Sequence, residues 1–212
     1  MTRCNRERFK LANNVNHQKE LEKIIASLEG RPKLLLHSCC APCSSYCLIY
    51  LLPHFDITCF YYNPNITDKD EYEKRTAELH RLVAMLNEEY SSSIEVIDGP
   101  YEPDKFVSAA EDGGLASCPE GGDRCRMCFS MRLGKAYEAA VAGGFEYFTT
   151  TLTISPLKNA EVINTIGYGI GGTMWLPSDF KKHDGFRQSI ELSRKYGLYR
   201  QNYCGCEYSK NK

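Results

Sequence analysis

The distribution of cysteine constrains this chain more than any other feature. Eight of the eleven cysteines in the 212-residue sequence fall in three groups that long stretches of chain separate. The groups are Cys39/Cys40/Cys43, Cys118/Cys125/Cys128 and Cys204/Cys206. In a reducing compartment, clustered thiols bind metal or exchange electrons more often than they form structural disulfides. The pattern therefore predicts a metal or redox site that is assembled from distant parts of the chain.

Composition indicates a globular protein with no general attraction to nucleic acid. Charged residues make up 25%, hydrophobic residues 42%, and the net charge is −1, so any RNA contact must come from a local basic face. The beginning of the chain has no signal-like apolar segment, and no apolar run approaches the roughly 18 residues of a membrane span. We therefore expect a cytoplasmic protein without a membrane partner. Residues 1–30 are expected to form an N-terminal extension and helix, and residues 31–212 a single α/β domain.

Hydrophobic periodicity predicts alternating strands and helices. We expect strands at residues 33–37, 57–62, 94–97, 147–151 and 174–176, and helices at residues 16–28, 44–52, 70–86, 103–112, 129–142, 156–166 and 186–196. Ser155-Pro156 is typical of a helix start, with a capping serine before a first-turn proline. Such alternation favours a mostly parallel sheet flanked by helices, a Rossmann-like α/β fold, here with a cysteine-bearing C-terminal tail. Ligands in such folds bind beyond the carboxyl ends of the strands.

The first two cysteine groups have the spacing of metal ligands. On an extended backbone, the adjacent Cys39 and Cys40 point in different directions, so that one serves a cluster and the other a second metal. Cys125 and Cys128 lie at the expected start of a helix, where both sulfurs share one side and the helix dipole favours thiolate. Two thiols from each segment make four, enough for tetrahedral zinc or an iron–sulfur cluster. Spacing alone favours neither metal.

The remaining cysteines leave several roles open. Cys204 and Cys206, with a glycine between them, form either an easily reduced disulfide or a pair of ligands for one metal. Cys43 completes a C-x-x-C motif with Cys40, as in a thioredoxin-like dithiol, but that alternative leaves the other groups unexplained. Cys118 is either a spare ligand or a solvated thiol. Three others are expected to be bystanders: Cys4, Cys47 and Cys59.

A loop near the end of the expected sheet carries the remaining candidate, Asp179. It precedes Lys181 and Lys182, and the segment reads either as a solvated turn or as an edge of the substrate site. Basic residues and tyrosines interleave over residues 181–203, which suits phosphate contacts and base stacking. An exposed charged helix has the same composition.

Five motifs, in order, resemble those of the epoxyqueuosine reductase family of the QueH type over about residues 33–208. They are H-S-C-C-A-P-C at 37–43, F-Y-Y-N-P-N at 60–65, C-R-M-C at 125–128, T-T-T-L-T-I-S-P at 149–156 and Y-R-Q-N-Y-C-G-C at 199–206. The resemblance implies an iron–sulfur oxidoreductase that reduces epoxyqueuosine to queuosine at the wobble position of tRNA. This reaction is the last step of queuosine synthesis and proceeds here without cobalamin.

The resemblance also implies a fold and a set of site residues. The fold is of the adenine-nucleotide-hydrolase-like α/β kind (HUP-like), and it holds a 4Fe–4S cluster beside a separate iron. The cluster ligands carried over are Cys39, Cys40, Cys125 and Cys128. Cys204 and Cys206 become a redox-active disulfide or part of the second iron site, which Cys43 also lines. An external donor supplies the electrons, and we expect Asp179 to position the substrate or supply a proton.

Two rival functions make different predictions from the same sequence. A tRNA thiolation enzyme of the ATP-pyrophosphatase kind shares the fold class, but it should carry a Ser-Gly-Gly-x-Asp-Ser loop after the first strand. Residues 38–45 contain no glycine, which counts against ATP chemistry. A zinc-dependent RNA-binding module would instead be colourless, with tightly bound zinc and no open coordination position.

Overall fold

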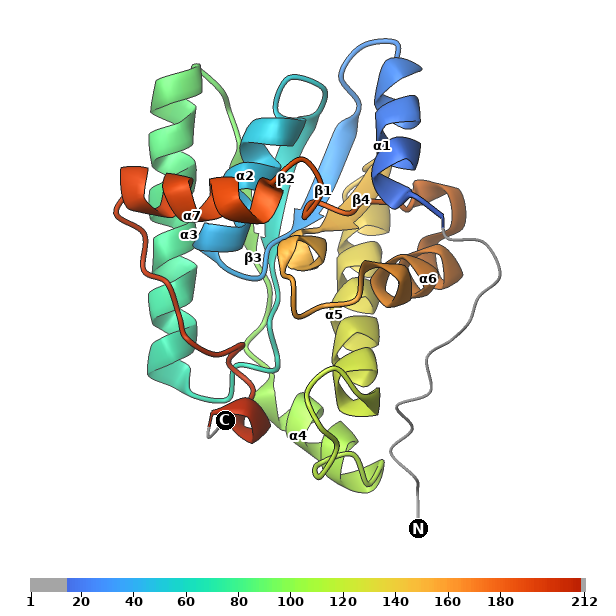
Figure 1. The fold of residues 1–212 in the computed structure, drawn as a ribbon, viewed down its shortest axis with the longest axis vertical. Helices are drawn as coiled ribbons and strands as arrows, with labels where there is room; N and C mark the ends of the chain where they lie inside the picture. The colour runs from blue at the N-terminus through green and yellow to red at the C-terminus, as the bar shows by residue number, and fades with distance from the viewer. Residues whose placement is uncertain (1–14, 211–212) are drawn as a thin grey trace.

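The computed structural model of the chain describes residues 15–210 and shows an α/β fold built on one parallel sheet (Figure 1). In this part of the chain the sheet has four strands, in the order β3-β2-β1-β4. The strands are β1 (Lys33–His37), β2 (Asp56–Tyr61), β3 (Glu95–Asp98) and β4 (Tyr147–Thr150). The helices are α1 (His17–Ala26), α2 (Ala41–Leu51), α3 (Lys69–Tyr90), α4 (Pro103–Asp112), α5 (Asp123–Ala142), α6 (Ala160–Gly171) and α7 (Gly185–Lys195), with short 3-10 turns η1 (Thr151–Ile154), η2 (Gly172–Met174) and η3 (Glu207–Ser209). The predicted fold class is confirmed.

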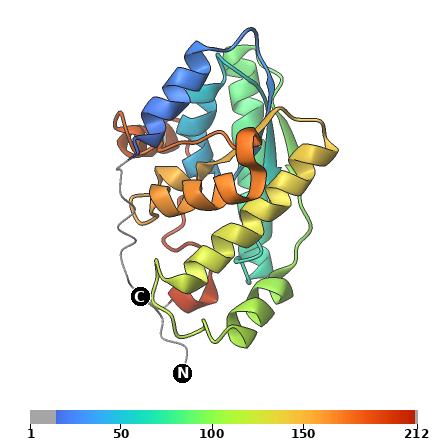
Figure 2. The ribbon, with the colours of Figure 1, turned by 90° about the vertical axis from the view of Figure 1, so that its right-hand side faces the viewer.

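Helices cover both faces of the sheet and so form three layers. One buried cluster joins the sheet to α1, α2, α3 and α7, and a second joins its other face to α5 and α6 (Figures 1 and 2). The chain adds β2 and β3 on one side of β1 and then returns through α4 and α5 to place β4 on the other side. The ends of β1 and β4 therefore lie at a topological switch point, where open α/β sheets bind their ligands.

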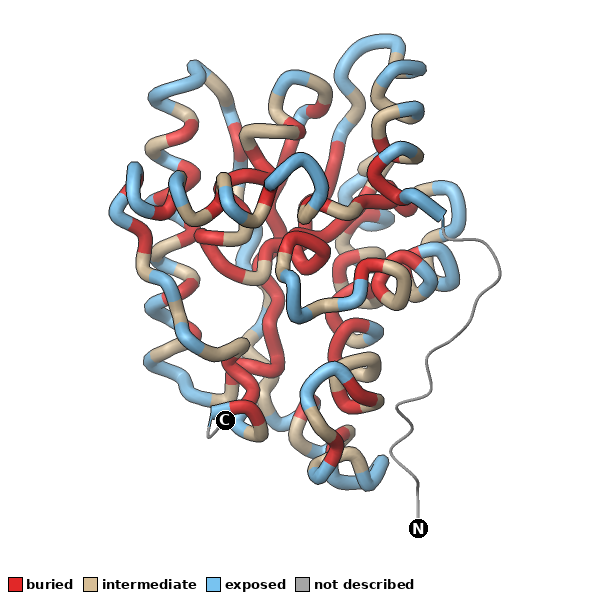
Figure 3. Tube along the Cα trace, in the orientation of Figure 1, coloured by how far each residue is buried: buried red, intermediate tan, exposed pale blue. Residues whose placement is uncertain are grey.

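The central strand is anchored through both of its faces. Leu34 and Leu36 belong to one buried cluster and Leu35 to the other, as strand alternation requires. All three are fully buried, and buried residues run along the strands in Figure 3. Burial of each such side chain is worth about 1.5–3 kcal/mol. The loop that follows β1 therefore starts from a rigid support.

Two local predictions are wrong. Residues 174–176 do not form a strand: Trp175 makes only an isolated bridge to Phe148, because the 3-10 turn η2 extends to Met174 and Pro177 has no amide hydrogen to continue a ladder. Helix α6 begins at Ala160 rather than at 156. Asn159 is its N-cap and accepts from two backbone amides of the first turn, so the Ser155-Pro156 pair belongs to the preceding loop.

The N-terminal part of the described chain is a helix that packs against the domain. Helix α1 occupies residues 17–26, whereas residues 1–14, with Cys4, lie outside the described part of the chain. Cys47 and Cys59 are fully buried, and burial raises the pKa of both thiols, so they behave as apolar packing residues as expected. Over residues 15–210, none of the helices combines the length and the apolar character that crossing a membrane requires.

Candidate metal and redox site

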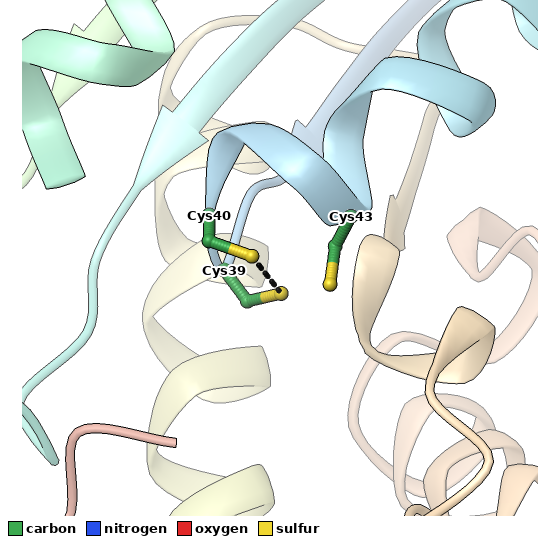
Figure 4. A group of neighbouring side chains, drawn as sticks. All are labelled: Cys39, Cys40 and Cys43. Carbon is green, nitrogen blue, oxygen red and sulfur yellow. Dashed lines mark hydrogen bonds between the residues drawn. The ribbon is translucent and has the colours of Figure 1, made fainter. Parts of the chain in front are cut away.

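Three thiols converge where β1 passes into α2. The sulfur atoms of Cys39, Cys40 and Cys43 all lie within 4.8 Å of one another, and those of Cys39 and Cys40 are 3.8 Å apart (Figure 4). The expectation that Cys39 and Cys40 point apart is wrong. The chain leaves the strand at His37 and Cys40 already caps α2, so strand alternation no longer applies. The group has the composition and spacing of a metal site.

The group contains one favoured thiolate. Hydrogen bonds from Cys40 and Cys43 hold the pKa of Cys39 well below its usual value, and the positive charges of Arg132 and Lys158 lower it further. The same hydrogen bond with Cys39 raises the pKa of Cys40 to about 11, and its counterpart raises the pKa of Cys43. Binding of a metal to all three thiols would therefore release protons from Cys40 and Cys43.

Two other motifs hold this loop in place. The hydroxyl of Thr151 accepts from the Cys39 backbone amide at 3.1 Å and donates to the Cys39 sulfur at 3.3 Å. The side-chain amide of Asn63 donates to the Ser38 carbonyl at 3.1 Å. The Asn-Pro-Asn turn after β2 is thus more than a turn, because it fixes the backbone next to the thiols.

A second group of thiols lines a cavity at the start of α5. Cys125 and Cys128 share this α5 cavity with Cys204 and Cys206, which confirms that the C-x-x-C sulfurs lie on one side of the helix. The helix dipole is expected to favour thiolates here, but burial outweighs it and raises the pKa of both thiols, that of Cys128 to about 11.

The C-terminal segment reaches this cavity through contacts with distant elements. Asn65 donates to the Cys204 carbonyl at 3.0 Å, and the Arg75 guanidinium donates to the same carbonyl at 3.2 Å. Arg75 is itself paired with Glu71 at 2.6 Å. Side chains from the β2–α3 region therefore place this cysteine pair.

Gly205 allows the segment to pass close to its support. Its φ of +99° is a conformation that side chains disfavour, and an added Cβ would lie 2.6 Å from Cγ1 of Ile66. Neither Cys204 nor Cys206 forms a disulfide. Hydrogen bonds, first from Cys206 and then from the Ser209 hydroxyl (3.2 Å), lower the pKa of Cys204 to about 4, while the pKa of Cys206 is raised.

The two thiol groups face adjoining cavities. A strand-end cavity is lined by Cys39 and Cys43, and six of its other lining residues, Arg132, Lys158 and Cys204 among them, also line the α5 cavity. In residues 15–210 no second set of three metal-ligating side chains lies within 4.8 Å, so Cys125 and Cys128 do not join Cys39 and Cys40 at the spacing of a single-ion site. The structure brings the three cysteine-bearing segments to one region without joining them in one compact set.

Comparisons with known proteins identify the family. The family described as "Epoxyqueuosine reductase QueH" matches residues 34–212. The chain belongs to the QueH family. Proteins named epoxyqueuosine reductase QueH are 45% identical in Staphylococcus epidermidis (93% of this chain, 86% of the relative), 43% in Streptococcus pyogenes serotype M1 (90% and 75%) and 34% in Thermotoga maritima (83% and 89%). The resemblance drawn from the five motifs is confirmed, and the chain is an oxidoreductase.

Asp179 and Cys118 lie apart from the thiol cavities. Asp179 pairs with Lys181 at 2.7 Å and lines a neighbouring cavity, which Lys158 also lines. Its assignment as a catalytic residue stays a prediction. Cys118 is only 3% exposed, in the loop before α5, so the alternative of a solvated thiol is wrong.

Sequence reasoning missed a buried histidine–arginine pair beside Cys39. His37 lies 2.7 Å from the Thr150 hydroxyl and 3.1 Å from the Tyr62 carbonyl, and Arg132 donates to its Nε2 at 3.3 Å. Burial, with the Arg132 charge, lowers the pKa of His37 to about 3, so the ring is neutral. Arg132 stands four residues after Cys128, one turn along α5, and this spacing was the available signal.

Proposed function

We propose that this protein reduces epoxyqueuosine to queuosine at the wobble position of tRNA, the last step of queuosine synthesis. The relatives' name supports the substrate. The observation that carries the proposal is the convergence of three cysteine-bearing segments on two adjoining cavities that share Arg132 and Lys158. An enzyme that acts on one base of an RNA must take that base out of its stack into a pocket. The cytoplasm, where we expect the protein, is consistent with such a substrate.

The donor set fits an iron–sulfur centre. Soft thiolate ligands select iron–sulfur clusters, zinc or cuprous ions, and the two cavities offer thiols from separate segments rather than one closed tetrahedral set. We assign the 4Fe–4S cluster to Cys39, Cys40, Cys125 and Cys128. Cys43, Cys204 and Cys206 would line a second, mononuclear iron or supply a redox dithiol. No cobalamin takes part in this proposal.

The reaction requires two electrons and two protons. Both carbon–oxygen bonds of the epoxide break, a carbon–carbon double bond forms, and the oxygen leaves as water. The iron–sulfur centre supplies single electrons when it is bound. Cys204 and Cys206 can supply an electron pair by closing to a disulfide, which an external donor must then reduce. Asp179 would position the substrate or supply a proton, acting from the neighbouring cavity through Lys158 and Lys181.

The C-terminal segment offers contacts for the RNA. Arg200, Gln201, Asn202 and Tyr203 line the strand-end cavity next to the thiols. A guanidinium suits a phosphate, two amides suit base edges, and a tyrosine ring suits stacking on a base. Of the basic and aromatic residues at 181–203, the last ones, at 200–203, are therefore the best candidates for contact with the substrate.

An anaerobic turnover assay tests the function. The protein, loaded with iron and sulfide, is incubated with tRNA that carries epoxyqueuosine and with a low-potential reductant, and the digested nucleosides are analysed by mass spectrometry. We expect queuosine, lighter than the substrate by one oxygen. The Staphylococcus epidermidis relative serves as the positive control. If that relative converts the tRNA while this protein, equally loaded, leaves epoxyqueuosine unchanged, the proposal fails.

A further inference from the structure

Arg132 is a buried cation that lies between the two thiol groups. It is 3% exposed and lines both the strand-end cavity and the α5 cavity. Its guanidinium is held by the side-chain oxygen of Asn63 and by His37, at 3.3 Å. Asn63 in turn donates to the Ser38 carbonyl, and the His37 ring is fixed by Thr150. The charge therefore has a fixed position relative to the loop that carries Cys39.

The direct partners of Arg132 do not balance its charge. Asn63 offers an amide oxygen and His37 accepts at its Nε2, so neither supplies a negative charge, and no carboxylate of residues 15–210 pairs with the guanidinium. Arg75, which is equally buried, differs because Glu71 lies 2.6 Å from it. A buried charge without a counter-charge is strongly destabilising. The structure must therefore supply an anion to Arg132 from another source.

Cysteines lie on either side of the guanidinium. Arg132 lines the strand-end cavity together with Cys39 and the α5 cavity together with Cys128, which stands one turn before it on α5. The carboxylate of Glu120 also lines both cavities, but this residue is exposed to solvent. A redox centre held by these cysteines would therefore place its negative charge beside Arg132.

We propose that Arg132 is a positioning residue that carries the counter-charge of the thiolate-bound redox centre and raises the reduction potential of that centre. This inference rests on the proposed function, since it requires a redox centre on these cysteines. Reduction adds negative charge, and a nearby fixed cation stabilises the reduced state relative to the oxidised one. Because Arg132 is already oriented by His37 and Asn63, it needs no rearrangement when the electron arrives.

The test is the reduction potential of iron-loaded variants, measured by electron paramagnetic resonance at defined ambient potentials. In Arg132→Met, we expect the ratio of reduced to oxidised centre at a given ambient potential to fall at least about tenfold, or about 59 mV for a one-electron step. Arg132→Lys keeps the positive charge, so its ratio of reduced to oxidised centre should lie within about threefold of the wild-type ratio. Arg81→Met removes the same charge from a side chain bonded to Glu78 and lining neither cavity, and should leave the ratio unchanged.

A second variant covers the case in which Arg132→Met does not fold. Asn63→Asp is nearly isosteric and gives Arg132 the carboxylate it lacks. The ratio of reduced to oxidised centre should therefore fall in this variant, as it does in Arg132→Met. Asn63→Leu also loses the hydrogen bond to Ser38 but adds no charge, and it is the matched control.

The outcomes separate this inference from the proposed function. An unchanged potential in iron-loaded Asn63→Asp and Arg132→Met overturns the role of Arg132 and leaves the reductase proposal standing. The proposed role of Arg132 is also overturned if turnover falls in these variants while the reduction potential stays constant, because Arg132 would then act on the substrate. Wild-type protein that takes up no iron, and converts no substrate beside an active relative, overturns the reductase proposal itself.

Discussion

The loop after β1 and the C-terminal cysteine segment carry similar chemistry on very different supports. Each holds one thiol with a lowered pKa, Cys39 or Cys204, beside neighbours whose pKa values are raised. The first loop lies between a buried strand and a helix, and its backbone is tied to the sheet through Thr151. The second follows α7 without regular structure until η3.

The difference lies in what must break for each segment to move. Moving Cys39 would disrupt the end of the central strand and the first turn of α2. Moving Cys204 requires the loss of a few side-chain hydrogen bonds, chiefly those that Asn65 and Arg75 make to its carbonyl and the one between its thiol and Ser209. Segments with few regular hydrogen bonds open at lower free energy than core elements do. We therefore expect the first loop to be the fixed metal anchor and the second to be the adjustable partner.

The largest effect should come from the anchor. In Cys39→Ser, loss of the favoured thiolate should remove bound iron and lower turnover by at least about 100-fold. Iron content and tRNA turnover are measured together. Cys47→Ala is the control, since this buried thiol lies on α2 away from the cavities and should cost only ~1 kcal/mol of stability. Cys39→Ser protein with wild-type iron and turnover would contradict the assignment.

A smaller effect is expected when the adjustable segment is displaced. In Gly205→Ala, the new methyl group would meet Ile66, so the thiols shift, and turnover should fall roughly 10- to 100-fold while iron is largely kept. Gly197→Ala is the matched control, because Gly197 also has a positive φ (+57°) but an added Cβ meets nothing within 4 Å. It should cost roughly 1–2 kcal/mol of stability and leave turnover intact. Equal turnover of Gly205→Ala and Gly197→Ala would show that the position of the C-terminal thiols does not affect the reaction.

The pH dependence of alkylation should distinguish the two C-terminal thiols. In reduced, metal-free protein, the Cys204 pKa of about 4 predicts alkylation already at pH 6, whereas Cys206 stays a thiol. The folded pKa lies below the usual value of 9.0, so ionised Cys204 stabilises the fold fully above pH 9, and this stabilisation is lost as pH falls to about 4.

Peptide mapping after iodoacetamide treatment measures this reactivity from about pH 4 to about pH 10. Ser209→Ala removes a hydrogen bond to the thiolate, so alkylation of Cys204 should begin at a higher pH. Alkylation of wild-type Cys204 that rises only near pH 9 would contradict the assigned thiolate.

The smallest effect is expected at Asp179. Its carboxylate pairs with Lys181 in the cavity beside the thiols rather than in a thiol cavity, so a positioning or proton-supplying role predicts that Asp179→Asn lowers turnover about three- to tenfold and stability by ~1 kcal/mol. Asp184→Asn, which removes a more exposed pair with Arg187, is the control and should leave turnover unchanged. Full turnover in Asp179→Asn would remove the role proposed for this residue.

The sequence predicted the elements whose periodicity is strong. The helix expected at residues 70–86 is the central part of α3, and the strand at 33–37 matches β1 residue for residue. The strand expected at 174–176 is reduced to a single bridge between Trp175 and Phe148, because a short apolar run does not show how many of its residues pair with a neighbouring strand. Tertiary context decides such cases.

The candidate site was predictable in its cysteines but not in their grouping. Cysteine spacing indicated the three segments, yet Cys43 joins Cys39 and Cys40 more closely than Cys125 and Cys128 do, since a turn of α2 brings it back toward the strand end. The roles of Arg132 and Asn63 could not be predicted, although Arg132 stands one turn after Cys128 and Asn63 lies in the F-Y-Y-N-P-N motif. Their roles depend on a histidine ring and on a backbone carbonyl at the end of β1, a distant part of the sequence.

The most direct test of the account is metal analysis of protein purified without oxygen. Iron, zinc and acid-labile sulfide are quantified per chain, and the visible spectrum is recorded. We expect brown protein with a broad absorption band near ~400 nm and at least roughly four irons and four sulfides per chain. An iron content above that of the cluster would favour the second metal site. Colourless protein with stoichiometric zinc and no sulfide would contradict the iron–sulfur centre on which the proposed reduction depends.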